Sequence, residues 1–177
     1  VREGVSLEDG PLNPLTPYAK TKALSEELFL HKDIDSVIFR FATAYGMSDN
    51  PRLDTVVNHM TATAYYENKI VINGSGRYRA VLHVKDIVRG IELALYNKQN
   101  KYRVYNLGSD DQNLKIGEIG EIISKEFPGV EMTVDDSSLD KRSYIIGYER
   151  AKVDLGFVPK YSIKDAVIEL REAFKSG

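Results

Sequence analysis

The chain has 177 residues, of which 42% are hydrophobic and 28% charged, and its formal net charge is −2. Such values are typical of a globular protein with an ordinary core, and without a basic excess they exclude nucleic acid and anionic membrane surfaces as expected partners. The chain has no cysteine, which excludes disulfides and thiol chemistry and favours a cytoplasmic location. His31, His59 and His83 lack the spacing of zinc ligands, so no metal site is expected.

The first sixteen residues contain several Pro, Gly and Asp residues and predict a loop. Thr16 is a suitable N-cap and Pro17 a suitable first helical residue, so a helix is predicted to run from there to about Leu30. The apolar run at 36–42 then predicts a buried parallel strand.

Further along the chain, Asp86 is predicted to cap a helix whose inner stripe contains Ile87, Ile91, Ala94 and Leu95. The other predicted helices lie at 52–67, 116–127, 151–155 and 162–174, and the other strands at 70–72, 81–84, 103–107, 131–134 and 144–146. This alternation predicts an α/β fold with a mainly parallel sheet. Only the strands at 36–42 and 103–107 have the character of central strands, which makes a thin sheet for this class.

The sharpest chemical feature is the pair Tyr18 and Lys22, which are four residues apart and share one face of the predicted helix. A phenol is ordinarily too weak an acid to act as a base near neutral pH, and a neighbouring ammonium favours the phenolate. The same spacing recurs at Tyr65/Lys69 and Tyr148/Lys152, so at least two of the three pairs are incidental. Tyr18/Lys22 is preferred because it opens a helix that leads into a buried strand.

The segment from Asn13 to Lys22, with the sequence NPLTPYAKTK, resembles the active-site segment of extended short-chain dehydrogenases/reductases. The resemblance is to the NAD-dependent nucleotide-sugar epimerases and dehydratases of that family. It continues in the family's order through four further segments, which are RFATAYG at 40–46, GSGRYRAVLHVKD at 74–86, YNLG at 105–108 and LGFVP at 155–159. Several ordered matches over nearly the whole chain are more specific than any one of them.

The resemblance implies NAD as cofactor and a catalytic role for two residues. Tyr18 is expected to be the general acid/base that also contacts the cofactor. Lys22 is expected to bind the nicotinamide ribose and to assist Tyr18. Phe41, at the end of the buried strand, is expected to lie near the nicotinamide carboxamide.

The resemblance also implies a nucleoside-diphosphate sugar as substrate. Thr43 stands where many relatives have an Asn that reaches the diphosphate, and this departure weakens the contact or marks a subgroup. Asn58 matches a substrate-contacting Asn. Arg79 and Arg142 match two arginines that hold the diphosphate, and guanidinium groups suit such a ligand because they bind its oxygens in pairs.

By the same resemblance, residues 1–46 form the last part of an NAD-binding Rossmann domain and 47–177 form mainly the small α/β substrate-binding domain. Residues 83–108 are expected to return to the Rossmann-type sheet. The Gly-rich turn that holds the cofactor pyrophosphate is not found in the sequence. We therefore expect a partial Rossmann-type fold without its amino-terminal dinucleotide-binding half, and about 100 or more preceding residues.

The expected activity is nucleotide-sugar 4-epimerisation by transient oxidation at C4 of the sugar. The alternatives are a 4,6-dehydratase, which adds the elimination of water, and a non-catalytic nucleotide-sugar-binding relative. Relatives are commonly dimers through the helix that bears the tyrosine, and Leu24, Leu28 and Leu30 offer apolar surface for a homodimer or, equally, for an intramolecular core.

Three other features are predicted to be structural. Arg40 interrupts an apolar strand and is expected to be a paired arginine, and His83 is expected to be packed. The acidic residues Asp135, Asp136 and Asp140 are expected to form a solvated loop, because no calcium-loop spacing follows them.

Overall fold

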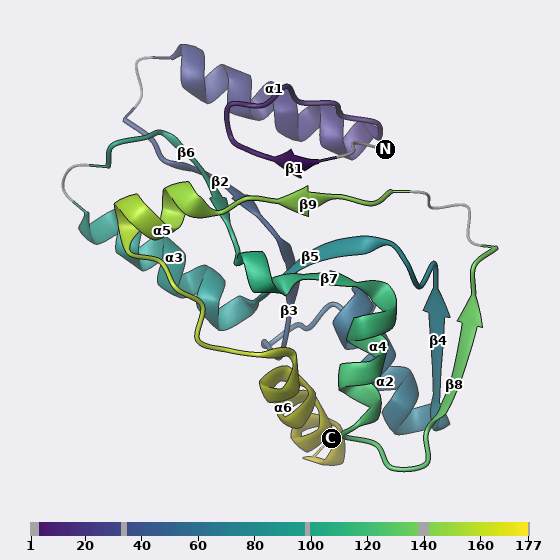
Figure 1. Cartoon of the computed structure of the whole chain (residues 1–177). Helices are drawn as coiled ribbons and strands as arrows, with labels where there is room; N and C mark the ends of the chain where they lie inside the picture. Colours follow the sequence, from purple (N-terminus) through teal and green to yellow (C-terminus); the bar gives the residue numbers. More distant parts are fainter. Residues whose placement is uncertain (1–3, 33–34, 98–99, 138–141, 177) are drawn as a thin grey trace.

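A computed structural model describes residues 4–32, 35–97, 100–137 and 142–176 of the chain (Figure 1). Its helices are α1 (Pro17–His31), α2 (Val56–Glu67), α3 (Val84–Tyr96), α4 (Ile116–Ser124), α5 (Glu149–Leu155) and α6 (Ile163–Ser176), with a short 3-10 turn at Asp110–Gln112. Its strands are β1 (Val5–Ser6), β2 (Ile38–Phe41), β3 (Thr43–Tyr45), β4 (Lys69–Asn73), β5 (Tyr78–His83), β6 (Val104–Leu107), β7 (Asn113–Lys115), β8 (Glu131–Asp135) and β9 (Ile145–Ile146).

The strands pair mainly in parallel, as the sequence predicts. The parallel pairs are β1 with β9, β2 with β6, β3 with β5, and β4 with β8, whereas β5 and β7 pair antiparallel. The two predicted central strands are neighbours, with Ile38 opposite Val104 and Phe41 opposite Leu107. The expected division into two domains, with residues 83–108 returning to the Rossmann-type sheet, stays a prediction.

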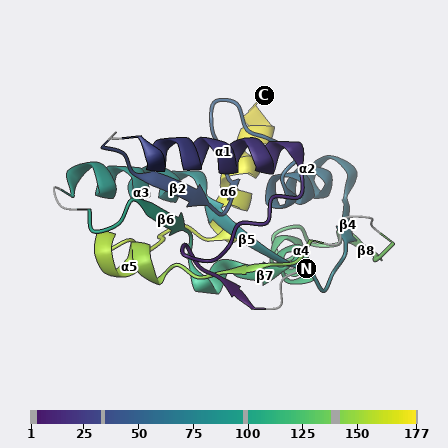
Figure 2. The same cartoon turned by 90° about the horizontal axis from the view of Figure 1, so that it is seen from above.

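Two hydrophobic clusters hold the fold together. The first joins β2, β5 and β6 to α3 and α5, and the second joins β3, β4 and β5 to α2, α4 and α6 (Figure 1). Seen from above, α1 lies along β2 on the side away from α5 (Figure 2). The described helix α1 has no buried residue, and Leu24 and Leu28 are exposed.

Several helix ends follow the predicted local signals. The Thr16 hydroxyl accepts a hydrogen bond from the Ala19 N–H at 3.1 Å, and Pro17 is the first residue of α1. Gly156 ends α5 with a φ of 64°, a conformation that favours glycine. Ser162 precedes α6 and donates its backbone N–H to the Asp165 carboxylate at 2.7 Å, which is one half of a capping box.

The predictions for α3 were wrong in two respects. The cap is His83, whose Nδ1 accepts the Lys85 N–H at 3.1 Å, and the helix therefore begins before Asp86. The buried positions are Asp86, Gly90 and Ala94, whereas Leu95 is 77% exposed. Of the predicted stripe, Ala94 is buried and Ile87 packs against the core, and Gly90 lies so close to the Leu107 side chain that a Cβ there would lie 2.4 Å from it.

The predicted opening loop contains the short strand β1, which the sequence did not indicate. It lies beside a polar contact that fixes β2: Arg40 donates to the Glu26 carboxylate of α1 at 2.9 and 2.5 Å and to the Glu8 carbonyl at 3.0 Å. The prediction of a paired structural arginine is thereby confirmed. Among the described residues, no helix has the length and apolarity needed to cross a membrane, and no group of three or more metal-ligating side chains is found.

Candidate active site

The face of α1 that carries Tyr18 and Lys22 is open. Tyr18 is 72% exposed, and the Lys22 ammonium lies 5.6 Å from the centre of the Tyr18 ring. The two other Tyr-x-x-x-Lys pairs differ from this arrangement: Tyr148 is buried, and Tyr65 packs against Phe174. Of the three pairs, Tyr18/Lys22 is therefore the one whose phenol can meet a ligand.

Four of the predicted site residues line one cavity of about 450 Å³: Tyr18, Phe41, Thr43 and Asn58. Phe41 ends β2 and is 45% exposed, and Thr43 begins β3 two residues later. The end of β2 and the start of β3 thus place Phe41 and Thr43 at the same cavity as Tyr18 of α1. The cavity is lined further by residues of the loop that joins β3 to α2, namely Gly46, Ser48, Asn50, Arg52 and Thr55.

The Asn58 side chain is 2% exposed and engaged within the protein. Its Oδ1 accepts the Gly46 N–H at 2.9 Å, and its Nδ2 donates to the carbonyls of Gly46 at 3.3 Å and Arg52 at 3.0 Å. The substrate contact expected from the sequence is not tested by these contacts, which are all with the protein backbone.

Arg79 and Arg142 are brought together from distant parts of the chain. The Arg79 guanidinium donates to the Arg142 carbonyl at 2.5 Å, and its carbon lies 5.6 Å from the centre of the Tyr144 ring. Tyr144 lines the cavity of Tyr18 and also a second cavity of about 660 Å³, which Arg142 and Phe41 line too. Arg79 lines a third cavity of about 220 Å³, together with Asp54, His59 and Asn73. Tyr144 therefore connects the tyrosine side of the site to the two arginines.

The residues that line the cavity and were not predicted include Tyr144 and Arg52. The Arg52 guanidinium forms a two-point ion pair with Asp54, at 3.0 and 2.6 Å. Hydrogen bonding and charge from Asp54 raise the pKa of Arg52, and the negative charge of an ionised Tyr18 adds to this rise. A polar loop just before a helix is the signal that could have drawn attention to Arg52.

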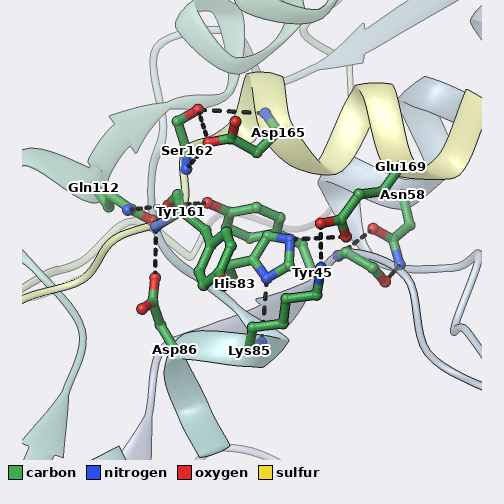
Figure 3. Close-up of polar contacts among 11 residues, drawn as sticks. Tyr45, Asn58, His83, Lys85, Asp86, Gln112, Tyr161, Ser162, Asp165 and Glu169 are labelled. Carbon is green, nitrogen blue, oxygen red and sulfur yellow. Dashed lines mark hydrogen bonds and ion pairs between the residues drawn. The ribbon is translucent and has the colours of Figure 1, made fainter. Parts of the chain in front are cut away.

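A network of buried polar groups lies beside the cavity, between β3, β5 and α6 (Figure 3). Tyr45 lines the cavity, but its hydroxyl turns to Gln112 Oε1 at 3.1 Å, and burial raises the pKa of that phenol. His83 is fully buried, packs against the rings of Tyr45 and Tyr161, and has its pKa lowered by burial. The prediction of a packed histidine is confirmed, and neither residue competes with the exposed Tyr18 as a base.

Asp86 belongs to the same network and is fully buried. Its carboxylate accepts the backbone N–H groups of Lys160 at 3.0 Å and Tyr161 at 2.9 Å and pairs with Arg89 at 2.5 Å. Asp86 therefore ties the segment before α6 to the first turn of α3. Of the predicted acidic loop, Asp136 accepts hydrogen bonds from Ser75, and Asp140 lies outside the described residues.

A sequence model of the NAD dependent epimerase/dehydratase family matches residues 3–108. Among curated proteins, the chain is 28% identical to a dTDP-glucose 4,6-dehydratase of Streptomyces griseus, over 94% of this chain and 52% of that protein. It is also 28% identical to a UDP-glucose 4-epimerase of Lactobacillus helveticus, over 91% of this chain and 56% of that protein. The chain thus spans about half the length of the curated relatives it matches.

Solved structures share the fold. A UDP-glucuronic acid 4-epimerase from Bacillus cereus, in complex with UDP-glucuronic acid and NAD, superposes with a TM-score of 0.82 at 24% identity, over 99% of this chain and 57% of that one. A dTDP-glucose 4,6-dehydratase from Bacillus anthracis, in complex with NAD, superposes with a TM-score of 0.80 at 22% identity, over 99% of this chain and 57% of that one.

Proposed function

Because this chain belongs to the NAD-dependent epimerase/dehydratase family, we propose that it supplies the acid/base tyrosine and the sugar pocket of a nucleotide-sugar 4-epimerase. The observation that carries the proposal is the position of Tyr18. It shares an exposed helix face with Lys22 and lines the same cavity as Phe41 and Thr43. Such a phenol can take a proton from a sugar hydroxyl and return it.

The residues around Tyr18 fit the nicotinamide end of NAD. A cavity of about 600 Å³ runs along α1 and β2 and is lined by Tyr18, Lys22 and Phe41. A hydroxyl and an ammonium suit the hydroxyls of a ribose, and the exposed Phe41 ring offers a flat apolar surface. We assign the holding of this end of the cofactor to these three residues. When bound, NAD supplies the hydride acceptor and donor at C4 of the sugar.

We assign the sugar to the cavity of Tyr18 and Thr43, and the diphosphate to Arg79 and Arg142. The hydrogen bond from the Arg79 guanidinium to the Arg142 backbone carbonyl supports this assignment, because it brings the two residues together. Guanidinium groups suit a doubly charged ligand. The Tyr18 hydroxyl moves the proton of the C4 hydroxyl, with the Lys22 ammonium beside its ring. A homodimer through the exposed Leu24 and Leu28 of α1 is part of the proposal.

The test is the product formed by the complete protein that contains this chain. The protein is incubated with NAD and UDP-glucose, or with dTDP-glucose, and the sugar is followed by proton NMR. The 4-epimer of the supplied sugar is expected. A 4-keto-6-deoxy sugar would replace the epimerase proposal by a 4,6-dehydratase, and binding of the nucleotide sugar without any turnover would indicate a non-catalytic relative.

A further inference from the structure

The loop that joins β3 to α2 is held at both ends by a single side chain. Asn58 accepts the Gly46 N–H and donates to the Gly46 and Arg52 carbonyls, at 2.9, 3.3 and 3.0 Å. An asparagine amide has two N–H donors and one carbonyl oxygen, so it can make all three of these hydrogen bonds at once. The loop begins at one of these partners and reaches α2 shortly after the other.

Asn58 forms hydrogen bonds with the first residue after β3, where the strand pairing ends. The β3–β5 register ends with Tyr45 opposite His83, and Gly46 is the next residue. The Asn58 amide meets both the N–H and the carbonyl of Gly46, as a neighbouring strand would. Its own position is fixed because it lies in the first turn of α2 and is 2% exposed (Figure 3).

The other side of Gly46 is closed by His83. Gly46 has a φ of 105°, and a Cβ there would lie 2.7 Å from His83 Nε2. The imidazole is itself held by the Lys85 N–H and by the ring of Tyr161. The peptide of Gly46 is therefore fixed between a packed ring and the Asn58 amide.

This geometry has a consequence for the cavity of Tyr18, because Ser48, Asn50 and Arg52 line that cavity from the same loop. We propose that Asn58 is a positioning residue: its amide closes the loop and so sets where these polar side chains stand, without itself contacting the substrate. The part of this inference that concerns the sugar rests on the function proposed above.

The experiment compares Asn58→Ala and Asn58→Asp with a matched control in the complete protein. Asn58→Ala removes all three contacts, and Asn58→Asp keeps an acceptor for the Gly46 N–H while losing both donors. The control is Thr61→Val: Thr61 is a buried polar residue of the same helix whose hydroxyl donates to the Val57 carbonyl at 2.8 Å. It lines neither the cavity of Tyr18 nor the loop.

The first measurement is hydrogen exchange of the amides at 46–55, which is independent of any reaction. Exchange at least about tenfold faster than in wild type is expected in Asn58→Ala, and a smaller increase in Asn58→Asp, with Thr61→Val unchanged. Equal exchange in wild type and the three variants would show that the Asn58 amide does not hold the loop. Should Asn58→Ala not fold, Asn58→Asp alone decides against the same control.

The second measurement is the affinity for UDP-glucose and for NAD by calorimetry. A rise of about tenfold in the Kd for the nucleotide sugar is expected in Asn58→Asp, with the Kd for NAD unchanged. Fast loop exchange with an unchanged sugar affinity would remove the positioning role. If the wild type binds no nucleotide sugar, the proposed function fails. The exchange measurement still tests whether the Asn58 amide holds the loop.

Discussion

The Lys22 ammonium lies 5.6 Å from the centre of the Tyr18 ring, one helical turn further along α1. Both residues lie on α1, which has no buried residue among those described. The Tyr18 hydroxyl and the Lys22 ammonium therefore lie outside the hydrophobic core. Replacement of either residue should therefore affect ligands and turnover far more than the stability of the fold.

Replacing Tyr18 with Phe removes the hydroxyl and keeps the ring. General acid/base catalysis contributes about 10²- to 10⁴-fold, so a fall in kcat of that order is expected with little change in Tm. Steady-state kinetics and thermal unfolding of the complete protein measure the two quantities. Tyr96→Phe is the matched control, because Tyr96 is 83% exposed on α3. Unchanged turnover in Tyr18→Phe would exclude the phenol from the reaction.

Replacing Lys22 with Met should weaken NAD binding. The ammonium can donate charge-assisted hydrogen bonds, and loss of about 1.5 kcal/mol corresponds to roughly a tenfold higher Kd. Calorimetric titration with NAD measures it. Lys20→Met, an exposed lysine of the same helix, is the control and should leave the Kd unchanged. Equal affinities in wild type and Lys22→Met would contradict the assigned role.

Replacing Asp86 with Asn should destabilise the protein strongly. The buried carboxylate accepts the N–H groups of Lys160 and Tyr161 and pairs with Arg89. An amide has no charge and only one acceptor oxygen, so its NH2 group would face one of these donors. Loss of one partner of a buried pair costs about 3–5 kcal/mol of unfolding free energy. Denaturant unfolding tests this, with the exposed Glu92→Gln of the same helix as control. A loss no larger than that of the control would mean that the ties made by Asp86 are weak.

The pH dependence of stability should depend partly on His83. Burial lowers the pKa of His83, with Lys85 acting in the same direction and Glu169, Asp86 and Asp165 opposing it. The unfolded state therefore binds the proton more readily, and stability is lost as the pH falls below the ordinary histidine value of about 6.5.

The measurement is denaturant unfolding of wild type and His83→Asn between pH 7.5 and 5.5. Asparagine can still cap α3 but does not titrate, so the variant should lose less stability over this range. His31→Asn is the control, since the His31 side chain is 79% exposed. Parallel pH profiles for wild type and His83→Asn would show that His83 does not carry the dependence.

The sequence by itself determined those features that depend on near neighbours along the chain. Thr16 and Pro17 begin α1, Gly156 ends α5, and Ser162 precedes α6, because each acts on backbone groups within a few residues. The alternation of apolar runs was likewise sufficient to predict the α/β class and the two strands β2 and β6, but not that these two strands pair. The Tyr18/Lys22 pair could be found because both residues stand on one helix.

Only the tertiary structure decided the contacts between residues far apart in the chain. Aspartate is a residue type favoured at helix caps, yet Asp86 accepts the N–H groups of a segment more than seventy residues later. Arg79 contacts the Arg142 carbonyl, and the Asn58 amide is engaged by Gly46 and Arg52. Local propensity carries no information about such partners, because packing of the helices on the strands determines which polar groups are buried together.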